Sequence, residues 1–557
     1  MTFINYLIIV TTFFLITQVH TYKILGIFPL AFKSHNIFFQ ALIKSLAKKG
    51  HQVDIISYYE AKNPPDNYRD IINLSKLPNS SYFLSKSEFN SIQEAVEESG
   101  SIKKLLRDTY GLPTCKIISH ERIQNFIKKI PENSPYDAVI TEGLVAPCYY
   151  GFGFLLNVPI ISASSNFEFT PLAKQVGNPP CMSFMPTALL PKFHLKTFWN
   201  RLRNSVLSFL IEILFFLISE KQSIIMQKYL NKNIPSVRQV ERTVALSIIN
   251  THHSLRGVKP VTEAVIEIAG LHIEEDNSTL SKELMKWMDE SVHGIVYISF
   301  GTALPLESLP KETLLSMFSS FAKLAPMRIL IKVTKKNKLP PEIPENVLTM
   351  IWIPQIPILK HRNTRVFISH GGIHSVIEAL YFGIPVIGIP IVYDQDQNLR
   401  LLENKNMCII LDYDKITENS MDMAISKMLN DSSFRKAAQY HSKLFLDRPM
   451  NPGNEAVYWI EYVIRNGGES LRSPAVNMYW YQVELLDVYG FLFCCILLII
   501  CLILVTVKVI LKKYKINTKT FIITDGLSSI AKSMLSIFLK FSPKLKFKSV
   551  LIFQSRQ

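Results

Sequence analysis

A His-Gly-Gly turn at residues 370–372 separates two apolar segments of the chain. Residues 365–369 predict a short buried strand, 373–381 a helix and 385–389 a second buried strand, which together make one parallel β-α-β unit. The paired glycines let an anion approach the backbone closely, and the free N–H groups at the start of the helix donate hydrogen bonds to it. The chemistry predicted for this turn is therefore recognition of a phosphate.

Polar side chains at fixed offsets extend this pattern. Ser375 lies in the first helical turn, where its hydroxyl adds a donor, and Glu378 follows one turn later, placed to accept hydrogen bonds from a pair of sugar hydroxyls. A Gly-Gly pair alone most often only turns the chain. Together with His370, Pro385 and the Asp-Gln pair at 394–395, however, the stretch resembles the signature of the UDP-glycosyltransferase family.

This resemblance covers residues from about Tyr22 to about Leu511 and implies the GT-B fold. GT-B is an α/β fold of two Rossmann-like, doubly wound domains that face each other across a cleft. In the family, the second domain binds a UDP-sugar, which is a co-substrate, and the first binds the acceptor. No cofactor and no metal are implied. The positions that match the UDP-sugar site are Lys259, Thr302, Trp352, Gln355, His370, Gly371, Gly372, Ser375, Glu378, Asp394 and Gln395.

For several of these positions, the residue type and its place in the predicted elements also indicate a role. The predicted strand 294–300 ends in a Gly-Thr turn, where the backbone and hydroxyl of Thr302 would contact a phosphate. The indole of Trp352 offers a flat surface on which a nucleotide base can stack. The alternative is that Trp352 is a core side chain. Gln355 follows Trp352 in the chain. Lys259 stands where many relatives carry arginine. A lysine keeps the charge but loses the bidentate fork.

His35 begins another predicted β-α-β unit, with strands at 23–28 and 53–57 and a helix at 35–49. It lies at the carboxyl edge of a parallel sheet, where open α/β folds place their ligands. A helix N-terminus disfavours imidazolium and keeps the ring neutral, which suits a proton acceptor. The alternative is an exposed histidine that caps the helix.

Glu142 ends the strand predicted at 136–142, at the same edge of the sheet. A carboxylate there would orient the imidazole of His35 and stabilise its protonated form. The family resemblance implies that His35 is the general base and Glu142 its partner. Vertebrate members have aspartate at the position of Glu142, so the extra methylene changes the hydrogen-bond geometry.

Asp394 and Asp396 form an Asp-Gln-Asp sequence like the metal-binding motif of other glycosyltransferases. We reject a metal site here, because Asp394 and Gln395 complete the signature described above. Family members hold donor-sugar hydroxyls with this pair. His374 is a departure, since vertebrate relatives often have asparagine there, and it affects either the phosphate contact or the donor sugar.

Two apolar segments predict membrane targeting of this 557-residue chain. Residues 6–16 are too few to span a bilayer and indicate a signal peptide, whereas residues 489–511 are enough for a transmembrane helix. Residues 512–557 hold ten Lys or Arg against one acid, and so account for more than half of the net charge of +16. By the positive-inside rule this tail is cytosolic and the catalytic part is lumenal. The charge therefore gives no argument for nucleic acid, and residence in the endoplasmic reticulum is implied by the family.

Three further features leave alternatives open. Residues 206–218 predict either a buried cap helix or a lipophilic wall that touches the membrane and admits apolar acceptors. Apolar residues at helical spacing between 527 and 541 indicate an amphipathic helix on the cytosolic leaflet, or a disordered basic tail. Four cysteines outside the membrane segment allow at most two disulfides, and none can be assigned. Lumenal glycosylation sequons occur at Asn73, Asn79, Asn277 and Asn430.

The predicted order along the chain is a signal peptide at 1–21, an N-terminal acceptor-binding Rossmann-like domain at 22–257, a C-terminal UDP-sugar-binding Rossmann-like domain at 258–450, a return helix at 451–472 that braces the first domain, a linker at 473–488, a transmembrane helix at 489–511 and the basic tail at 512–557.

The predicted activity is inverting transfer of a hexose, with glucose favoured, from a UDP-sugar to a hydroxyl of a small lipophilic acceptor, as in detoxification or hormone conjugation. A competing class is a membrane-anchored UDP-sugar or lipophile-binding protein without catalysis. The presence of His35 and Glu142 argues against that class. A transferase acting on a hormone or a membrane lipid, and a homo- or hetero-oligomer, remain open.

Overall fold

The computed structural model describes residues 21–514, apart from 79, 100–107, 132, 168 and 188–196. The chain divides into two compact units, of which the first ends at Val476 and the second begins at Asn477. Residues 1–20 of the predicted signal peptide lie outside the described residues. Most of the basic tail does too, including the amphipathic helix predicted between 527 and 541.

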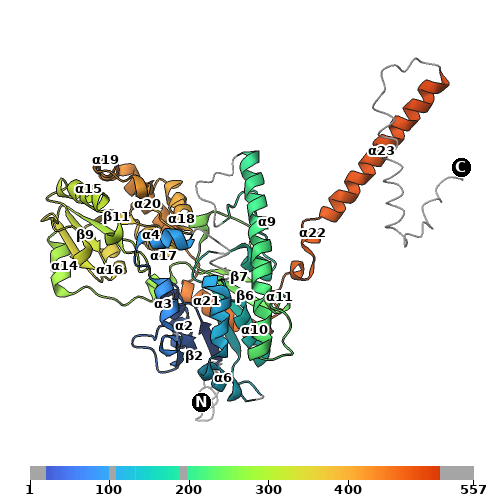
Figure 1. Ribbon diagram of the computed structural model, residues 1–557, viewed down its shortest axis with the longest axis horizontal. Helices are drawn as coiled ribbons and strands as arrows, with labels where there is room; N and C mark the ends of the chain where they lie inside the picture. Colours follow the sequence, from blue (N-terminus) through green and yellow to red (C-terminus); the bar gives the residue numbers. More distant parts are fainter. Residues whose placement is uncertain are drawn as a thin grey trace, which may run out of the picture. The chain divides into compact units, whose positions relative to one another are not determined.

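The first half of unit 1, drawn in blue to green in Figure 1, is built on a parallel sheet. The sheet has seven strands in the order β3-β2-β1-β4-β5-β6-β7. Successive residues point to opposite faces, so Ile24 belongs to one apolar cluster and Leu25 to another. Both faces are buried, as is typical of parallel sheets covered by helices. The strands are β1 (Lys23–Phe28), β2 (Gln52–Ser57), β3 (Tyr68–Asn73), β4 (Ala138–Glu142), β5 (Ile160–Ser164), β6 (Val244–Ile249) and β7 (Val265–Glu267).

The second half of unit 1 contains a six-stranded parallel sheet with the order β10-β9-β8-β11-β12-β13. Two separate apolar clusters again cover its two faces. The predicted fold class, two doubly wound α/β sheets, is therefore confirmed. The strands are β8 (Ile295–Ser299), β9 (Arg328–Lys332), β10 (Val347–Met350), β11 (Thr364–Ser369), β12 (Val386–Gly388) and β13 (Cys408–Ile410).

Helices connect and cover these strands. Those of the first half are α2 (Lys33–Lys48), α3 (Ser80–Ser87), α4 (Ile92–Ser99), α5 (Gly111–Lys116), α6 (Glu121–Lys128), α7 (Gly151–Leu156), α8 (Thr170–Gln175), α9 (Phe198–Glu220), α10 (Gln222–Tyr229), α11 (Val237–Glu241) and α12 (His253–Arg256). Those that follow are α13 (Leu271–Glu274), α14 (Lys282–Asp289), α15 (Lys311–Ala322), α16 (Gln355–Lys360), α17 (Ile373–Phe382), α18 (Gln395–Glu403), α19 (Glu418–Asn430), α20 (Ser432–Leu446) and α21 (Pro452–Asn466).

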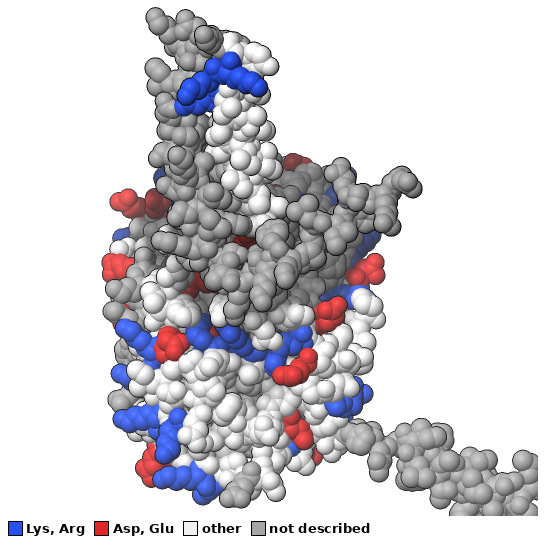
Figure 2. Space-filling model, turned by 90° about the vertical axis from the view of Figure 1, so that its right-hand side faces the viewer, with Lys and Arg blue, Asp and Glu red and all other residues white. Residues whose placement is uncertain are grey.

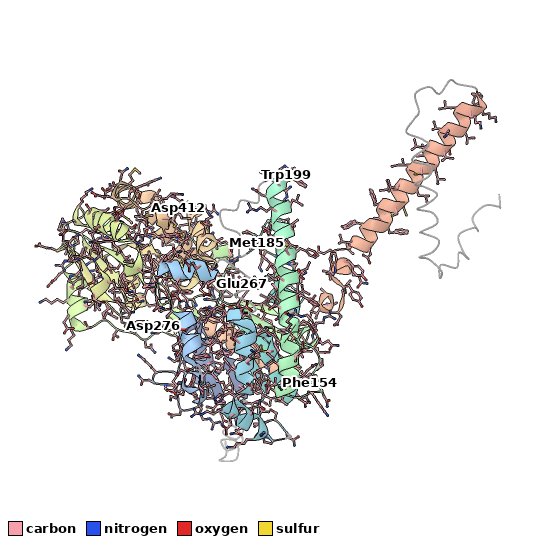
Figure 3. The ribbon with its side chains drawn as sticks, in the orientation of Figure 1. Phe154, Met185, Trp199, Glu267, Asp276 and Asp412 are labelled. Carbon is pink, nitrogen blue, oxygen red and sulfur yellow. A yellow bond between two sulfur atoms is a disulfide. The ribbon has the colours of Figure 1, made fainter. Side chains whose placement is uncertain are left out.

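Helix α9 covers the segment that the sequence left open between a buried cap and a lipophilic wall. It buries Ile211, Phe215 and Ile218 against the core of the first half. Its other face is exposed and apolar, and Trp199 lies at its N-terminal end (Figure 3). One face of α9 therefore covers the core of the first half, and the opposite face is exposed.

Helix α21 follows the second sheet in the chain but packs on the first. Ala456, Val457, Ile460 and Val463 are buried in the same apolar cluster as β1 and α2. Asn451 caps this helix, since its side-chain oxygen accepts hydrogen bonds from the backbone N–H groups of the first turn.

A disulfide joins Cys115 of α5 to Cys148, which follows β4. Both cysteines are fully buried. The bond lies between the two segments that carry Tyr110 and Val145. Sequence alone did not assign this pair, because spacing along the chain does not give spatial proximity.

Unit 2 contains α22 (Trp480–Val483) and α23 (Leu486–Lys513). Among the described residues, two helical stretches are long and apolar enough to cross a membrane, Phe198–Tyr229 and Leu486–Lys513. In the first, 33% of the most apolar window is buried inside the protein, and in the second 0%. Helix α23 carries Asp487 in its first turn and no further charged side chain before Lys508, and it ends in the basic side chains of Lys512 and Lys513 (Figure 2). These features are those of a membrane-spanning helix.

Candidate active site

A cavity of about 930 Å³ opens between the two halves of unit 1. Asp276, which lies between the two sheets in Figure 3, is part of its wall. The predicted site residues that line this cavity are His35, Thr302, Trp352, Gln355, His370, Gly372, Ser375, Glu378, Asp394 and Gln395. The first half supplies the first of these and the second half supplies the other nine.

His35 lies in the first turn of α2 and Glu142 is the last residue of β4. The two strands β1 and β4 are neighbours in register, so the loop after β1 and the end of β4 meet at the carboxyl edge of the sheet. Nδ1 of His35 lies 2.6 Å from Oε1 of Glu142. Because a carboxylate only accepts hydrogen bonds, Nδ1 carries the proton and Nε2 is left with a free lone pair.

The exposure of the two side chains differs in a way that suits a base and its support. The side chain of His35 is 18% exposed and faces the cavity, whereas that of Glu142 is 1% exposed. Phe32 packs beside the imidazole, with the ring centroids 4.9 Å apart. The histidine is thus held from two sides, and it is paired with a buried carboxylate rather than standing as an isolated helix cap.

Glu142→Gln is expected to lower kcat roughly 10- to 100-fold, which is less than removal of His35. The amide keeps the shape of the side chain and can still accept from Nδ1, but it loses the negative charge that stabilises imidazolium. Initial rates with saturating UDP-sugar measure this effect. Asp54→Asn, at a buried carboxylate outside the cavity, is the matched control. An unchanged kcat in Glu142→Gln would contradict the assigned role.

His370 is held between two glycines. A Cβ placed on Gly372 would lie 2.6 Å from Nε2 of His370, and one on Gly301 would lie 2.9 Å from its Cε1. Burial, followed by repulsion from Lys332, lowers the pKa of His370 to about 4, so the ring is neutral at pH 7. Its Nδ1 is buried without a hydrogen-bond partner in the described structure. A buried polar atom beside a cavity is a candidate ligand contact.

The turn after His370 leads into the N-terminus of α17 at the wall of the cavity. Gly371 has a φ of +88° and a Cβ there would lie 2.5 Å from Leu399, so only glycine fits without strain. Gly371 itself does not line the cavity, whereas Gly372 does and is the N-cap of α17. The free N–H groups of the first turn of α17 follow it, as an anion site requires.

A hydrogen-bonded chain links α16 and α17. Nε2 of Gln355 donates to Oε2 of Glu378 at 2.6 Å and to Oγ of Ser375 at 3.1 Å. Its Oε1 accepts from the hydroxyl of Tyr297 at 3.2 Å. The second oxygen of Glu378 contacts Nε2 of His272 at 3.1 Å. Three predicted nucleotide-binding residues thus form one hydrogen-bonded network in the wall of the cavity.

The Asp-Gln pair has two different roles. Oδ2 of Asp394 accepts from Nδ2 of Asn398 at 2.6 Å and from Nδ2 of Asn166, in the first half, at 3.2 Å. Gln395 points back, and its Oε1 accepts from the N–H groups of Ile391 and Val392. Asp394 is therefore placed to contact a ligand, while Gln395 shapes the loop that carries it.

Asp396 does not converge with Asp394 on a common point. It forms an ion pair with Arg400, with Oδ2 2.9 Å from Nε. Within the described ranges, no three His, Cys, Asp or Glu side chains gather closely enough to hold a metal ion.

Two predicted donor residues, Gly371 and Lys259, do not line the large cavity, and only Gly371 is next to a residue that does. Lys259 lines a separate small pocket together with Glu267, which Figure 3 labels, and it is absent from the wall of the large cavity. Lys259 lies on the segment between α12 and β7.

Several cavity residues were missed from the sequence or given no definite role. Lys332 ends β9 and lines the cavity, where burial and repulsion from Lys33 lower its pKa to about 8. His374 stacks on His272 with ring centroids 4.6 Å apart, and burial lowers its pKa. Asn166 follows β5. The position of Lys332 and Asn166 at strand ends was the available signal, because ligands of parallel sheets bind there.

The part of the cavity near His35 is largely apolar. Phe32, Tyr110, Leu144 and Phe169, which pack in or against the core of the first half, line it. The rings of Phe32 and Tyr110 pack against each other with centroids 4.8 Å apart. This wall suits an apolar ligand next to the imidazole.

Comparison with known proteins gives a consistent result. Residues 23–520 match the family model described as UDP-glucoronosyl and UDP-glucosyl transferase. UDP-glycosyltransferase UGT5 of Dactylopius coccus is 34% identical over 87% of this chain and 91% of its own length. UDP-glucosyltransferase 2 of the same insect is 32% identical, over 86% and 92%. Human UDP-glucuronosyltransferase 2B10 is 27% identical, over 82% and 88%.

Solved structures with the same fold include plant enzymes. Arabidopsis thaliana UGT89C1, complexed with UDP-L-rhamnose, aligns with a TM-score of 0.52 at 14% identity and covers 80% of this chain and 100% of its own. A UDP-glucosyltransferase from Polygonum tinctorium aligns with a TM-score of 0.53 at 14% identity, over 80% and 99%. At this identity the likeness establishes the GT-B fold alone.

Proposed function

Because this chain belongs to the UDP-glycosyltransferase family, we propose that it transfers glucose from UDP-glucose to a hydroxyl of a small lipophilic acceptor, with inversion at the anomeric carbon. The observation that carries the proposal is the His35–Glu142 pair, which faces the His370-Gly371-Gly372 turn across one cavity. A base on one side and an anion site on the other are the two parts that a single displacement needs.

In the proposed reaction the acceptor oxygen attacks the anomeric carbon of the sugar while its proton moves to Nε2 of His35. The bond between that carbon and the diphosphate oxygen breaks, and its electron pair leaves with UDP. The transition state is oxocarbenium-like, as in glycosidases. The negative charge of Glu142 stabilises the imidazolium that forms.

Charge develops on the diphosphate as the bond breaks. His370 is neutral at pH 7, so it contributes as a hydrogen-bonding group and not as a cation. The N–H groups that follow Gly372 donate to the phosphate oxygens, and Lys332, whose pKa of about 8 keeps it mainly protonated at pH 7, supplies positive charge. We propose that these groups neutralise the leaving group and that no metal ion takes part. Interactions that strengthen as charge develops accelerate the reaction.

The remaining donor contacts follow from the same geometry. Trp352 stacks on the uracil, the network of Gln355, Ser375 and Glu378 binds the ribose hydroxyls, and Thr302 contacts a phosphate. Asp394, which Asn166 and Asn398 hold in place, accepts from hydroxyls of the donor sugar. Lys259 has no part in this proposal, since it lies outside the cavity.

UDP-glucose is expected to support a kcat/KM at least tenfold higher than UDP-glucuronate. A carboxylate on the sugar prefers a bidentate arginine, and no arginine is among the described residues that line the cavity. The carboxylate of Asp394 would also repel it. As a control, the affinity of the same enzyme for each donor is measured by competition with UDP. Equal or better turnover with UDP-glucuronate would exclude this donor preference.

We propose a single-pass arrangement in the membrane of the endoplasmic reticulum, with α23 as the span, unit 1 in the lumen and the basic tail in the cytosol. The buried disulfide between Cys115 and Cys148 supports the lumenal side, because disulfides persist in oxidising compartments. An apolar acceptor would reach such a site from the membrane. This placement fits detoxification or hormone conjugation.

The proposed function is tested by assaying microsomes that contain the protein with a set of UDP-sugars and a set of acceptors. The products are identified by mass. Transfer of a hexose to phenolic or steroidal hydroxyls supports it. Binding of UDP without any product from these donors and acceptors would instead indicate a UDP-sugar-binding protein.

A further inference from the structure

Lys33 forms a contact that crosses the cavity. It is the first residue of α2 and stands two positions before His35. Its Nζ lies 4.1 Å from the centroid of the Trp352 ring, which belongs to the other half of unit 1. The indole is 54% exposed, so the ammonium covers a ring that a base would otherwise use.

A second ammonium group approaches the same ring. Nζ of Lys332 lies 5.9 Å from the Trp352 centroid, and Lys332 also donates a hydrogen bond to the carbonyl of Gly301. Within the described part of the chain, Lys33 has no carboxylate partner. Two cations from opposite sheets thus converge beside one indole, and an anion between them would relieve their repulsion.

The pair of ammonium groups on Lys33 and Lys332 differs in its surroundings from lysines on an ordinary charged surface. Lys332 is largely buried at the end of β9, and the Gly301 turn next to it lies against His370. The cations therefore stand beside the turns predicted to hold phosphate, and Lys33 comes from the half that carries the base. Nothing in the sequence signature refers to position 33.

We propose that Lys33 is a donor-recognition residue supplied by the first half: when the base of a nucleoside diphosphate stacks on Trp352, the Lys33 ammonium leaves the indole and binds the diphosphate. The inference rests on the proposed function of this cavity. A charge-assisted hydrogen bond to phosphate is stronger than a cation–π contact on a half-exposed ring, so the exchange favours the bound state.

The position of Lys33 links this contact to catalysis. Lys33 and His35 share the first turn of α2, so a bond from Lys33 to the diphosphate fixes the turn that carries the base. Donor binding would then draw α2 toward the second half and set His35 before the acceptor reacts. The acceptor is therefore expected to bind the UDP complex more tightly than the free enzyme.

The test compares Lys33→Met with Lys44→Met by calorimetry, using UDP and uridine as ligands. Lys44 lies on the same helix and lines the same cavity, so its replacement removes the same charge at another position. Lys33→Met is expected to weaken UDP binding roughly 10- to 100-fold and to leave uridine binding within about twofold, or to strengthen it. Lys44→Met should change UDP binding less than threefold, and Lys33→Arg should preserve it.

Other outcomes decide against the inference. Equal weakening for UDP and uridine would mean that Lys33 only supports the indole. Tighter binding of both ligands would mean that it only covers the ring. Unchanged UDP affinity in Lys33→Met, in an enzyme that still transfers the sugar, would overturn the inference and leave the proposed function standing. Absence of UDP binding in the wild-type protein would instead overturn the proposed function. Equal thermal melting of the variants excludes misfolding.

Discussion

His35→Ala is expected to turn over roughly 10²- to 10⁴-fold more slowly than the wild-type enzyme, while its affinity for UDP stays within about twofold. The variant loses the group that accepts the acceptor's proton. Apart from the proposed contact of Lys33, the proposed UDP contacts lie on the other half of unit 1, in α16, α17 and the Thr302 turn. Initial rates with a phenolic acceptor and calorimetry with UDP, on the same purified protein, measure both quantities.

Two controls separate a lost base from a disturbed fold. His293→Ala removes an exposed histidine in the turn before β8 and should leave kcat unchanged. Added imidazole should restore part of the rate in His35→Ala, since it supplies a base to the emptied space beside Phe32. Turnover at the wild-type rate without imidazole would show that His35 does not accept the proton. Lost UDP binding would show that the base also shapes the donor site.

Gly372→Val is expected to weaken UDP binding by more than about 10²-fold, the largest effect on the donor side. A Cβ at this position meets the His370 ring at 2.6 Å, so the imidazole must move and the space for the phosphate is filled. Loss of charge-assisted hydrogen bonds from the helix N-terminus adds to the effect. UDP calorimetry measures it directly, and turnover falls with it.

A graded series makes this result specific. Gly372→Ala should lie between wild type and Gly372→Val, because it adds the clashing Cβ without the two methyl groups beyond it. Gly468→Ala is the control, since a Cβ there comes no closer than 3.4 Å to another side chain. Normal UDP affinity in a folded Gly372→Val protein would mean that no phosphate approaches this turn.

Much of the site could be predicted because strand ends are readable in the sequence. The apolar runs before His370, Glu142 and Thr302 indicated buried strands, and parallel strands present their carboxyl ends at one edge. The helix after Gly372 was predicted at 373–381 and runs from Ile373 to Phe382. The pairing of His35 with Glu142 followed from the same rule, because β1 and β4 are neighbours.

The rest depended on tertiary contacts that no local pattern encodes. Lys259 was placed in the donor site by analogy, whereas in the structure it lines a separate small pocket. The contact of Lys33 with Trp352 joins residues more than 300 positions apart, on different sheets. Likewise, α9 has apolar side chains on both its buried and its exposed face, and only the packing of Phe215 and its neighbours shows which face is buried.

Helix α21 has a consequence for how the chain folds during synthesis. Its side chains Ile460 and Val463 complete the core around β1 and α2, yet they are made after the whole second sheet. Domains generally fold from the N-terminus as synthesis proceeds. Here the first half stays incomplete, with an apolar face of α2 uncovered, until about residue 466 has entered its compartment. The helix that carries His35 therefore acquires its final support among the last events of folding, and a chain that stops before α21 exposes an apolar surface for chaperones to bind.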